Sequence, residues 1–183
     1  MRLEGWSLSS LVFFFFLFSI MLNVPSIIKN KAQSLKPSTP FSNAIDLSAH
    51  IEHDLVLEED CVNIIPTGLY LNMLDPELTS SLKEDEQLCA LVLPRSGLAS
   101  KYGITVANTP GLIDSDYQGE VKVALVRQSF SNLDFGQVKT IIKPNERIAQ
   151  LLFIVTKKVV LKPVESFKNK TERGEGGFGS TSI

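Results

Sequence analysis

The chain has 183 residues, which is enough for one domain with a substantial core but short for two. Its 44% hydrophobic and 21% charged residues are those of an ordinary globular protein. A formal net charge of −2 provides no basic surface for a nucleic-acid backbone, so individual arginines would have to hold any polyanionic ligand.

An apolar run of twelve residues, 11–22, lies near the N-terminus. It is shorter than the roughly 20 residues that a membrane-spanning helix needs. It resembles the apolar part of a secretory signal, but Arg2 and Glu4 cancel before it and no A-x-A-like cleavage site follows. Three interpretations stay open: a true start near Met21, a targeting or anchor segment, or a part of the fold. We expect residues 1–22 to lie outside the domain, no stable membrane partner, and a cytoplasmic protein unless this segment targets or tethers it.

Short apolar runs broken by turn residues follow from Val24 onward. Runs of four to eight residues, rich in Val and Ile and bounded by Pro, Gly, Asn and Asp, are typical of strands, and no segment keeps a helical period over three turns. We therefore expect an all-β, jelly-roll-like barrel or sandwich over 23–162 and a flexible C-terminal arm over 163–183. The predicted strands are 62–65, 69–74, 88–93, 104–107, 121–126, 138–142, 148–155 and 159–161. Predicted loops cover 75–87, with at most one helical turn, and 129–136.

Two segments that follow predicted strands could carry chemistry. Residues 94–97 (PRSG) offer a guanidinium fork, a hydroxyl and a glycine that lets a phosphate approach the backbone, although such a tetrapeptide is more often a turn. Residues 107–119 form a predicted hairpin that ends in Asp114 and Tyr117. The hairpin could offer backbone groups to a base and an acid to a water molecule, or it could be a long turn with solvated aspartates.

Two further segments are weaker signals. Residues 147–150 open an apolar strand, and Gln150 could direct an amide at a phosphate or simply lie at a strand edge. The glycine-rich residues 173–181 lack the Gly-Lys-Ser/Thr ending of a P-loop and alone would be a disordered terminus.

His50 and His53 have no third metal ligand near them, and Cys61 and Cys89 have no zinc or disulfide spacing.

Five segments, in order along the chain, resemble the motifs of the trimeric deoxyuridine triphosphatase (dUTPase) family. They are residues 44–47, 94–99, 108–120, 147–151 and 173–181, of which the third and fifth are long and specific. The sequence departs from the family pattern at Ala44-Ile45, where Gly-Tyr is usual, and at Asn145, where a turn glycine is usual. Asn tolerates a left-handed backbone, and the loops 75–87 and 129–136 are longer than the family leads us to expect.

The resemblance implies a homotrimer with shared active sites that hydrolyses dUTP to dUMP and pyrophosphate, so supplying dUMP for thymidylate synthesis. Asp114 would activate the water that attacks the α-phosphorus, and Tyr117 would pack under the deoxyribose. Because a lone aspartate is a weak base at neutral pH, Mg²⁺ on the triphosphate and the arginines would supply most of the charge stabilisation. Asp46 would lie near the phosphates and the Mg²⁺, linked to the ion through water, with no direct protein ligand.

The resemblance also implies the remaining substrate contacts. Uracil would be read by Asn108 with the backbone of Gly111, Leu112 and Ile113, and Phe178 would stack on the base. The residues implied around the phosphates are Arg95, Ser96, Gly97, Lys122, Gln150, Arg173, Gly179, Ser180 and Thr181.

Three other functions compete with this one. A dCTP deaminase of the same fold would attack the base with water, but the 173–181 tail and Asp114 to Tyr117 favour the dUTPase. A silent dUTP-binding regulator would lack the acid or the aromatic lid, and an assembly-only jelly roll would need none of the five segments.

Overall fold

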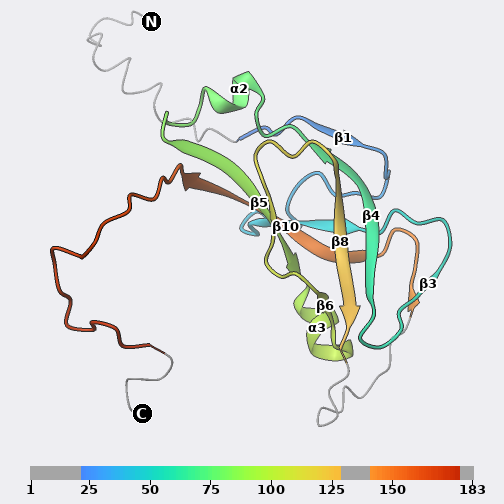
Figure 1. Ribbon diagram of the computed structural model, residues 1–183. Helices are drawn as coiled ribbons and strands as arrows, with labels where there is room; N and C mark the ends of the chain where they lie inside the picture. The colour runs from blue at the N-terminus through green and yellow to red at the C-terminus, as the bar shows by residue number, and fades with distance from the viewer. Residues whose placement is uncertain (1–21, 129–140, 178–183) are drawn as a thin grey trace, which may run out of the picture.

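Two four-stranded antiparallel sheets form the body of the computed structural model, which describes residues 22–128 and 141–177 (Figure 1). The first sheet has the order β1 (Ser26–Ile28), β4 (Val62–Leu71), β8 (Glu120–Arg127), β6 (Ile104–Val106). The second has the order β2 (Ala44–Ser48), β10 (Arg147–Lys157), β5 (Glu86–Pro94), β7 (Gly111–Ile113). A small sheet pairs β3 (Leu55–Val56) with β9 (Ile141–Ile142). Strands distant in sequence are neighbours in each sheet, so the all-β, jelly-roll-like prediction is confirmed.

The core lies between the two large sheets. Along β8, Val121, Val123 and Leu125 are fully buried while Lys122 between them is exposed, as expected for a strand with one face in the core. Side chains from the second sheet, such as Leu47 on β2 and Leu151 on β10, belong to the same cluster. The alternation in the sequence therefore fixes which side chains of β8 are left to make external contacts.

Strand β4 was predicted as two strands, 62–65 and 69–74, and this division is wrong. The structure has one strand with a register shift between Pro66 and Leu69. Gly68, within the shift, has φ +71°, and a Cβ there would lie 2.7 Å from the backbone nitrogen of Asn30. The turn residues that suggested a break therefore form a bulge inside a continuous strand.

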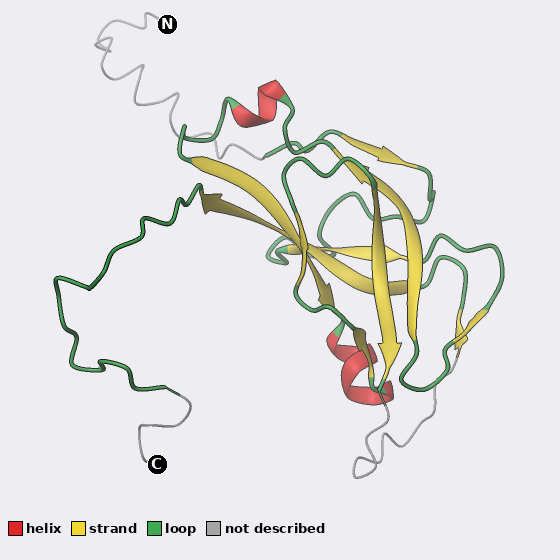
Figure 2. Ribbon diagram, viewed as in Figure 1, coloured by secondary structure: helices red, strands yellow, loops and turns green. Residues whose placement is uncertain are grey.

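Two elements near the predicted site were missed. Residues 94–97 do not form an isolated turn, because Ser96 begins α3 (Ser96–Tyr102), which buries Leu98 and ends at Gly103 with φ +65° (Figure 2). The hairpin 107–119 was correct in that β6 and β8 pair antiparallel, but it also contains β7, which pairs with β5 in the other sheet. Both elements are too short to show a period in the sequence.

The strand predicted at 159–161 is also wrong. β10 ends at Lys157, which pairs with Glu86, the first residue of β5, and a last backbone bond from the Lys158 amide to the Asp85 carbonyl at 2.8 Å ends the contact before residue 159. The side chains of Val159, Val160 and Leu161 are 77%, 92% and 89% exposed. Beyond Lys158 the described chain runs away from the body (Figure 1).

Other local predictions had mixed outcomes. The loop 75–87 contains the expected helical turn, α2 (Pro76–Thr79), capped by the Asp75 carboxylate, although Glu86 and Gln87 belong to β5. Asn145 adopts φ +64°, so the left-handed position is confirmed. The loop 129–136, most of the predicted strand 138–142 and residues 178–181 lie outside the described residues. In the part of the chain that the structure describes, no helix has the length and apolar character to span a membrane.

Candidate functional site

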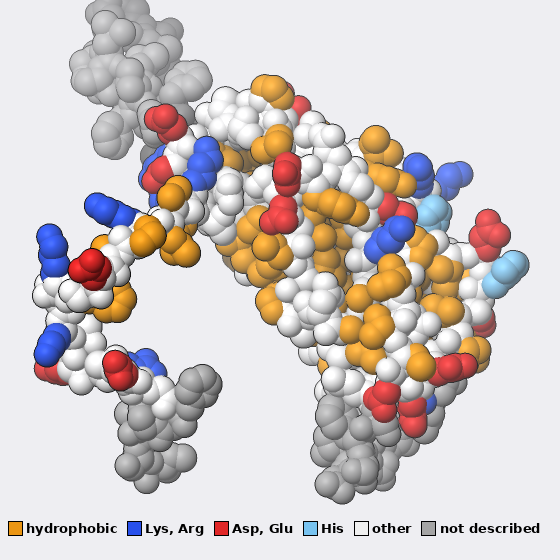
Figure 3. Space-filling view, in the orientation of Figure 1, with side chains coloured by type: hydrophobic (Ala, Val, Ile, Leu, Met, Phe, Trp, Pro, Cys, Tyr) orange, Lys and Arg blue, Asp and Glu red, His pale blue; other side chains and the backbone are white. Residues whose placement is uncertain are grey.

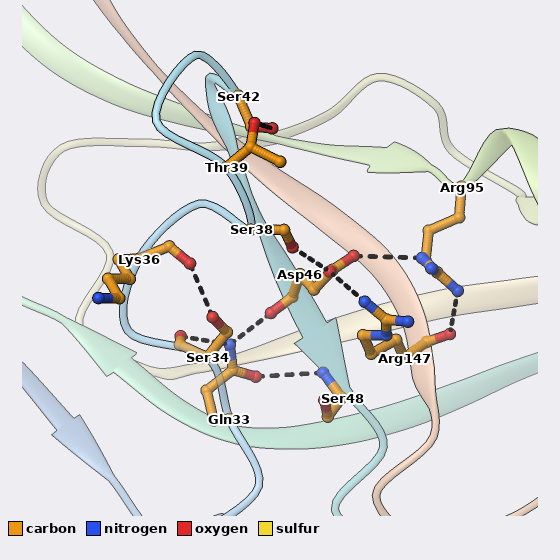
Figure 4. A network of polar contacts seen from close by, with 10 residues as sticks. All are labelled: Gln33, Ser34, Lys36, Ser38, Thr39, Ser42, Asp46, Ser48, Arg95 and Arg147. Atoms are coloured by element: carbon orange, nitrogen blue, oxygen red, sulfur yellow. Dashed lines mark hydrogen bonds and ion pairs between the residues drawn. The ribbon is translucent and has the colours of Figure 1, made fainter.

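A carboxylate held by two arginines lies at one end of the second sheet (Figure 4). Arg95 donates from Nε to Asp46 Oδ1 at 3.2 Å, and Arg147 donates from Nη1 to Asp46 Oδ2 at 3.0 Å. Ser38 adds a third bond from its hydroxyl to Oδ2 at 3.1 Å. The guanidinium of Arg95 also donates to the Arg147 carbonyl at 3.1 Å. One carboxylate thus faces two permanent cations, which leaves positive charge available for an anion.

Strand pairing explains why residues so distant in sequence meet there. Gln150 of β10 pairs with Asp46 of β2, and Ala149 pairs with Pro94 at the end of β5. Arg95 follows Pro94 directly, and Arg147 begins β10. The first, second and fourth of the five segments are therefore brought together by register alone.

A buried glutamine supports this cluster from beneath. Gln33, 6% exposed, donates from Nε2 to the Asp46 carbonyl at 2.6 Å and accepts from the Ser48 amide at 3.1 Å. Sequence reasoning missed Gln33, because it lies in an irregular segment with no motif. Arg147 was noted only as the start of its segment, and its charge at the head of an apolar strand was the available signal.

The other phosphate-side predictions are close to the cluster. The side chain of Gln150 donates from Nε2 to the Pro94 carbonyl at 3.0 Å, which leaves its second N–H for another acceptor. Ser96 and Gly97 are exposed in the first turn of α3, and a Cβ at Gly97 would meet nothing within 4 Å. An anion could therefore approach the backbone at Gly97.

The predicted base-reading segment forms an edge of the second sheet. Gly111, Leu112 and Ile113 pair with Val92, Leu91 and Ala90 on one side, and β7 is the last strand of that sheet. Among the described strands its other edge has no partner, so it offers backbone donors and acceptors, as an edge strand does. The amide of exposed Asn108 lies against Gly111, where a Cβ would be 3.1 Å from Asn108 Nδ2.

The predicted acid and tyrosine lie in the turn between β7 and β8. Asp114 is exposed, and its carbonyl accepts from the Tyr117 amide at 3.1 Å. Ser115 fixes this turn to β5 by donating to the Leu88 carbonyl at 2.6 Å. The Tyr117 hydroxyl donates to the Glu120 carbonyl at 3.0 Å, and its side chain is 43% exposed. A ligand could reach both groups from solvent.

Within one chain, however, the predicted site is divided. Ile113, at the start of the acid turn, pairs with Ala90, which lies five residues before Arg95. Five residues of extended strand span about 17 Å, so the acid turn and the arginine cluster are separated by about that distance along β5. Lys122 is exposed on β8 in the first sheet, and Arg173 lies in the exposed segment beyond β10. Phe178, Gly179, Ser180 and Thr181 lie outside the described residues.

The described residues contain no preformed metal cage. Across 22–128 and 141–177, no three His, Cys, Asp or Glu side chains gather as metal ligands. His50 and His53 are both exposed, as ordinary surface histidines are. Both cysteines are free thiols, Cys61 exposed and Cys89 buried.

Comparison with known proteins defines the class. The dUTPase family model matches residues 30–182. A deoxyuridine 5'-triphosphate nucleotidohydrolase of Tolumonas auensis is 41% identical over 144 residues, which are 79% of this chain and 83% of its own. The corresponding enzyme of Neisseria meningitidis serogroup A is 40% identical over 146 residues, 80% of this chain and 85% of its own.

Solved structures agree on the architecture. The dUTPase of Staphylococcus bacteriophage 80alpha, in complex with dUPNHPP, superposes with a TM-score of 0.69 at 21% identity, covering 89% of this chain and 100% of that one. A mutant dUTPase of phage phi11 of S. aureus, in which a structural Mg(II) ion is coordinated, gives a TM-score of 0.60 at 18% identity, covering 80% and 99%. The fold is that of the nucleotide-hydrolysing dUTPases. The chain belongs to the dUTPase family.

Proposed function

We propose that this member of the family, which hydrolyses dUTP to dUMP and pyrophosphate, uses a Mg²⁺-assisted attack of water on the α-phosphorus. The observation that carries the proposal is the exposed Asp114 beside Tyr117, in a turn that Ser115 bonds to β5, in a chain that also builds an arginine cluster for phosphates. Asp114 orients and deprotonates the water. Tyr117 packs under the deoxyribose, and Asn108 with the free edge of β7 reads uracil.

The phosphate contacts are assigned on the same basis. Arg95 and Gln150 approach the phosphates from the ends of their strands, and Ser96 with Gly97 offers a hydroxyl and open backbone at the start of α3. Arg173 and Lys122 add positive charge. Phe178 stacks on the base while Gly179, Ser180 and Thr181 wrap the triphosphate.

The donor set is compatible with Mg²⁺ that arrives on the substrate. The oxygens of Asp46 already accept from Arg95, Arg147 and Ser38, so this carboxylate is better placed to contact the ion through water than directly. Mg²⁺ prefers phosphate oxygens and waters to an all-protein cage, and when bound it would neutralise charge on the triphosphate. The arginines hold and orient the phosphates around it.

We further propose a homotrimer in which each site is shared between subunits. The acid turn and the arginine cluster are about 17 Å apart along β5, too far for one triphosphate to bridge easily within a chain. In addition, hydrophobic side chains gather over β4 and β8 (Figure 3), including Val62 and Ile64, which are 55% and 61% exposed. An exposed apolar sheet face of this kind is suited to burial against another copy.

The C-terminal arm can reach a neighbouring subunit. Because β10 ends at Lys157 rather than near Leu161, fifteen residues separate it from Arg173 and could span roughly 50 Å when extended. The last motif is therefore free to close over a site on another copy.

A cytoplasmic site of action is also proposed, with targeting or tethering through residues 11–22 as the alternative. Mass spectrometry of the native N-terminus would distinguish them: a chain that begins with Met21 indicates the later start, whereas a chain that keeps residues 11–22, or begins at another residue after a cleavage, indicates tethering or targeting.

A product assay tests the reaction. The purified chain with Mg²⁺ and dUTP should release pyrophosphate and dUMP, should show no ammonia release from dCTP, and should discriminate strongly against UTP and dTTP. Ammonia release without pyrophosphate would identify a deaminase, and binding of dUTP without turnover would identify a regulator. Acceptance of dTTP within tenfold of dUTP would contradict the uracil-pocket assignment.

A further inference from the structure

Gly119 is the point at which Tyr117 folds back onto its own chain. A Cβ built on Gly119 would lie 2.5 Å from Tyr117 Oη, 2.6 Å from Cζ and 3.0 Å from Cε2. Real Cβ atoms essentially never approach other atoms below 3.0 Å, so any side chain here must displace the phenol. The ring of Tyr117 occupies the space that glycine leaves.

The peptide around the ring is fixed on several sides. Tyr117 donates from its hydroxyl to the Glu120 carbonyl at 3.0 Å, and the Glu120 carboxylate accepts from the Gly68 amide at 2.9 Å. Gln118 donates from its side chain to Asn72 Oδ1 at 3.3 Å. Because the backbone is held in this way while the phenol is 43% exposed, the ring would give way before the chain.

The backbone at Gly119 does not itself demand glycine. The glycines with positive φ among the described residues are Gly68, Gly103 and Gly174, and Gly119 is not one of them. Alanine can adopt the backbone conformation of Gly119 without left-handed strain. The reason for glycine at this position is therefore the ring of Tyr117.

We propose that Gly119 is a positioning residue that sets the sugar specificity of the site, by leaving room for the ring of Tyr117 against residues 119–120. The proposal rests on the sugar-packing role proposed above for Tyr117. Alanine at position 119 turns the ring out and breaks its bond to the Glu120 carbonyl. The space beneath the sugar then opens to a 2′-hydroxyl. The arginine cluster belongs to other elements and is left unchanged.

The experiment measures kcat/KM for dUTP and for UTP in four variants: Gly119→Ala, Tyr117→Ala, their double variant and Gln118→Ala. Gly119→Ala should lower the dUTP/UTP ratio by about tenfold or more, a part of the roughly hundredfold that a pocket gains by rejecting one added hydroxyl. The double variant should match Tyr117→Ala within threefold, because the added methyl acts only through the ring. Gln118→Ala, which loosens the same turn without touching the ring, should keep the wild-type ratio within twofold.

A Gly119→Ala ratio that falls by less than about tenfold, with a collapsed ratio in Tyr117→Ala, would overturn the role of Gly119 while leaving the sugar role intact. An unchanged ratio in Tyr117→Ala would overturn the sugar role itself and our inference with it. If Gly119→Ala proves too unstable to assay, the double variant should still fold, because the clash is gone. A double variant that also fails to fold would show that Gly119 serves the backbone instead.

Discussion

At the scale of single residues, Asp114 is the group whose chemistry is easiest to isolate. Asp114→Asn keeps the size of the side chain. It also leaves the main-chain carbonyl of residue 114, which accepts from the Tyr117 amide, so the turn should survive. We expect kcat to fall by roughly 10² to 10⁴, as for the loss of a positioned general base, while Mg²⁺-dUTP binding changes little. Steady-state kinetics and binding of a non-hydrolysable dUTP analogue measure the two effects. Asp116 is an exposed acid in the same turn, so Asp116→Asn is the matched control. A kcat within threefold of wild type for Asp114→Asn would exclude the proposed role of Asp114.

Asp46 should matter for both stability and substrate binding. Its side chain is 15% exposed and holds Arg95 and Arg147, so Asp46→Ala leaves two guanidinium groups facing each other without a carboxylate. We expect a loss of about 1–2 kcal/mol in the free energy of unfolding, below that of a fully buried pair because Arg147 is 56% exposed. KM for dUTP should rise, since Arg95 loses its anchor. Urea titration and kinetics test this, and Ser38→Ala, which removes a single hydrogen bond, should show the same changes at smaller size.

At the scale of elements, predictability followed the length of the apolar run. β8 and β10 were predicted within a few residues because each is a long, largely apolar run rich in Val, Ile and Leu. α3 has seven residues, and its stabilisation comes from the buried Leu98 and the left-handed Gly103 rather than from a repeated pattern. β7 has three residues and exists through its pairing with β5, a contact between distant segments that local sequence does not record.

The strand wrongly predicted at 159–161 has a suitable sequence but lacks a partner strand. Val-Val-Leu has the composition of a strand, but a strand also needs a neighbour, and β5 ends its pairing at Glu86. The site shows the same limit: Asp46 and Arg95 were proposed from family resemblance, Arg147 was not, and strand register explains why the three converge. Gln33, buried beneath them, had no signal in the sequence.

The end of β10 is held by charges on the loop before β5. Lys157 donates to Asp85 and to Glu86, each at 3.0 Å, and the Lys158 amide donates to the Asp85 carbonyl at 2.8 Å. The hydrogen bonds from Lys157 lower the pKa of both carboxyls from their ordinary 3.8 and 4.5, and the same bonds raise the pKa of Lys157 above 10.5. The stabilisation that these ion pairs provide is therefore fully present at pH values between the ordinary pKa of the carboxyls and the ordinary pKa of lysine. It is lost as the pH falls through the lowered carboxyl pKa values, or rises through the raised lysine pKa.

Lys157→Ala should accordingly loosen the root of the arm in a pH-dependent way. At pH 7 we expect the exchange protection of the Lys158 amide, relative to its intrinsic rate, to fall about two- to fivefold, because exposed ion pairs are individually weak. Near pH 3 the difference from wild type should shrink as Asp85 and Glu86 protonate. Hydrogen exchange read by mass spectrometry measures this, with Lys162→Ala as the control in the same exposed segment. A difference that persists unchanged at pH 3 would mean that the carboxylates do not hold Lys157.

At the scale of the whole molecule, the division of the predicted site favours assembly over a self-sufficient chain. The arginine cluster, the acid turn and the arm are three separate pieces, and β5 separates the first two by about 17 Å. The exposed Val62 and Ile64 on β4 offer a face that a second copy could cover. Both features are accounted for if three chains each lend a different piece to every site.

Mixing two inactive chains tests that arrangement directly. One chain carries Asp114→Asn, and the other is truncated after Thr171, which removes Arg173 and the last motif but leaves β10 and its contacts with the loop intact. Each homotrimer should fold, assemble and lack most turnover. If a site takes its acid and its arm from different subunits, trimers formed by denaturing and refolding the mixture will contain some sites with an intact acid and an intact arm, and activity should return. Native mass spectrometry verifies that mixed trimers form, and refolding each variant alone is the control. Mixed trimers that stay inactive would show that acid and arm come from the same chain, and full activity in the truncated chain alone would show that the arm is dispensable.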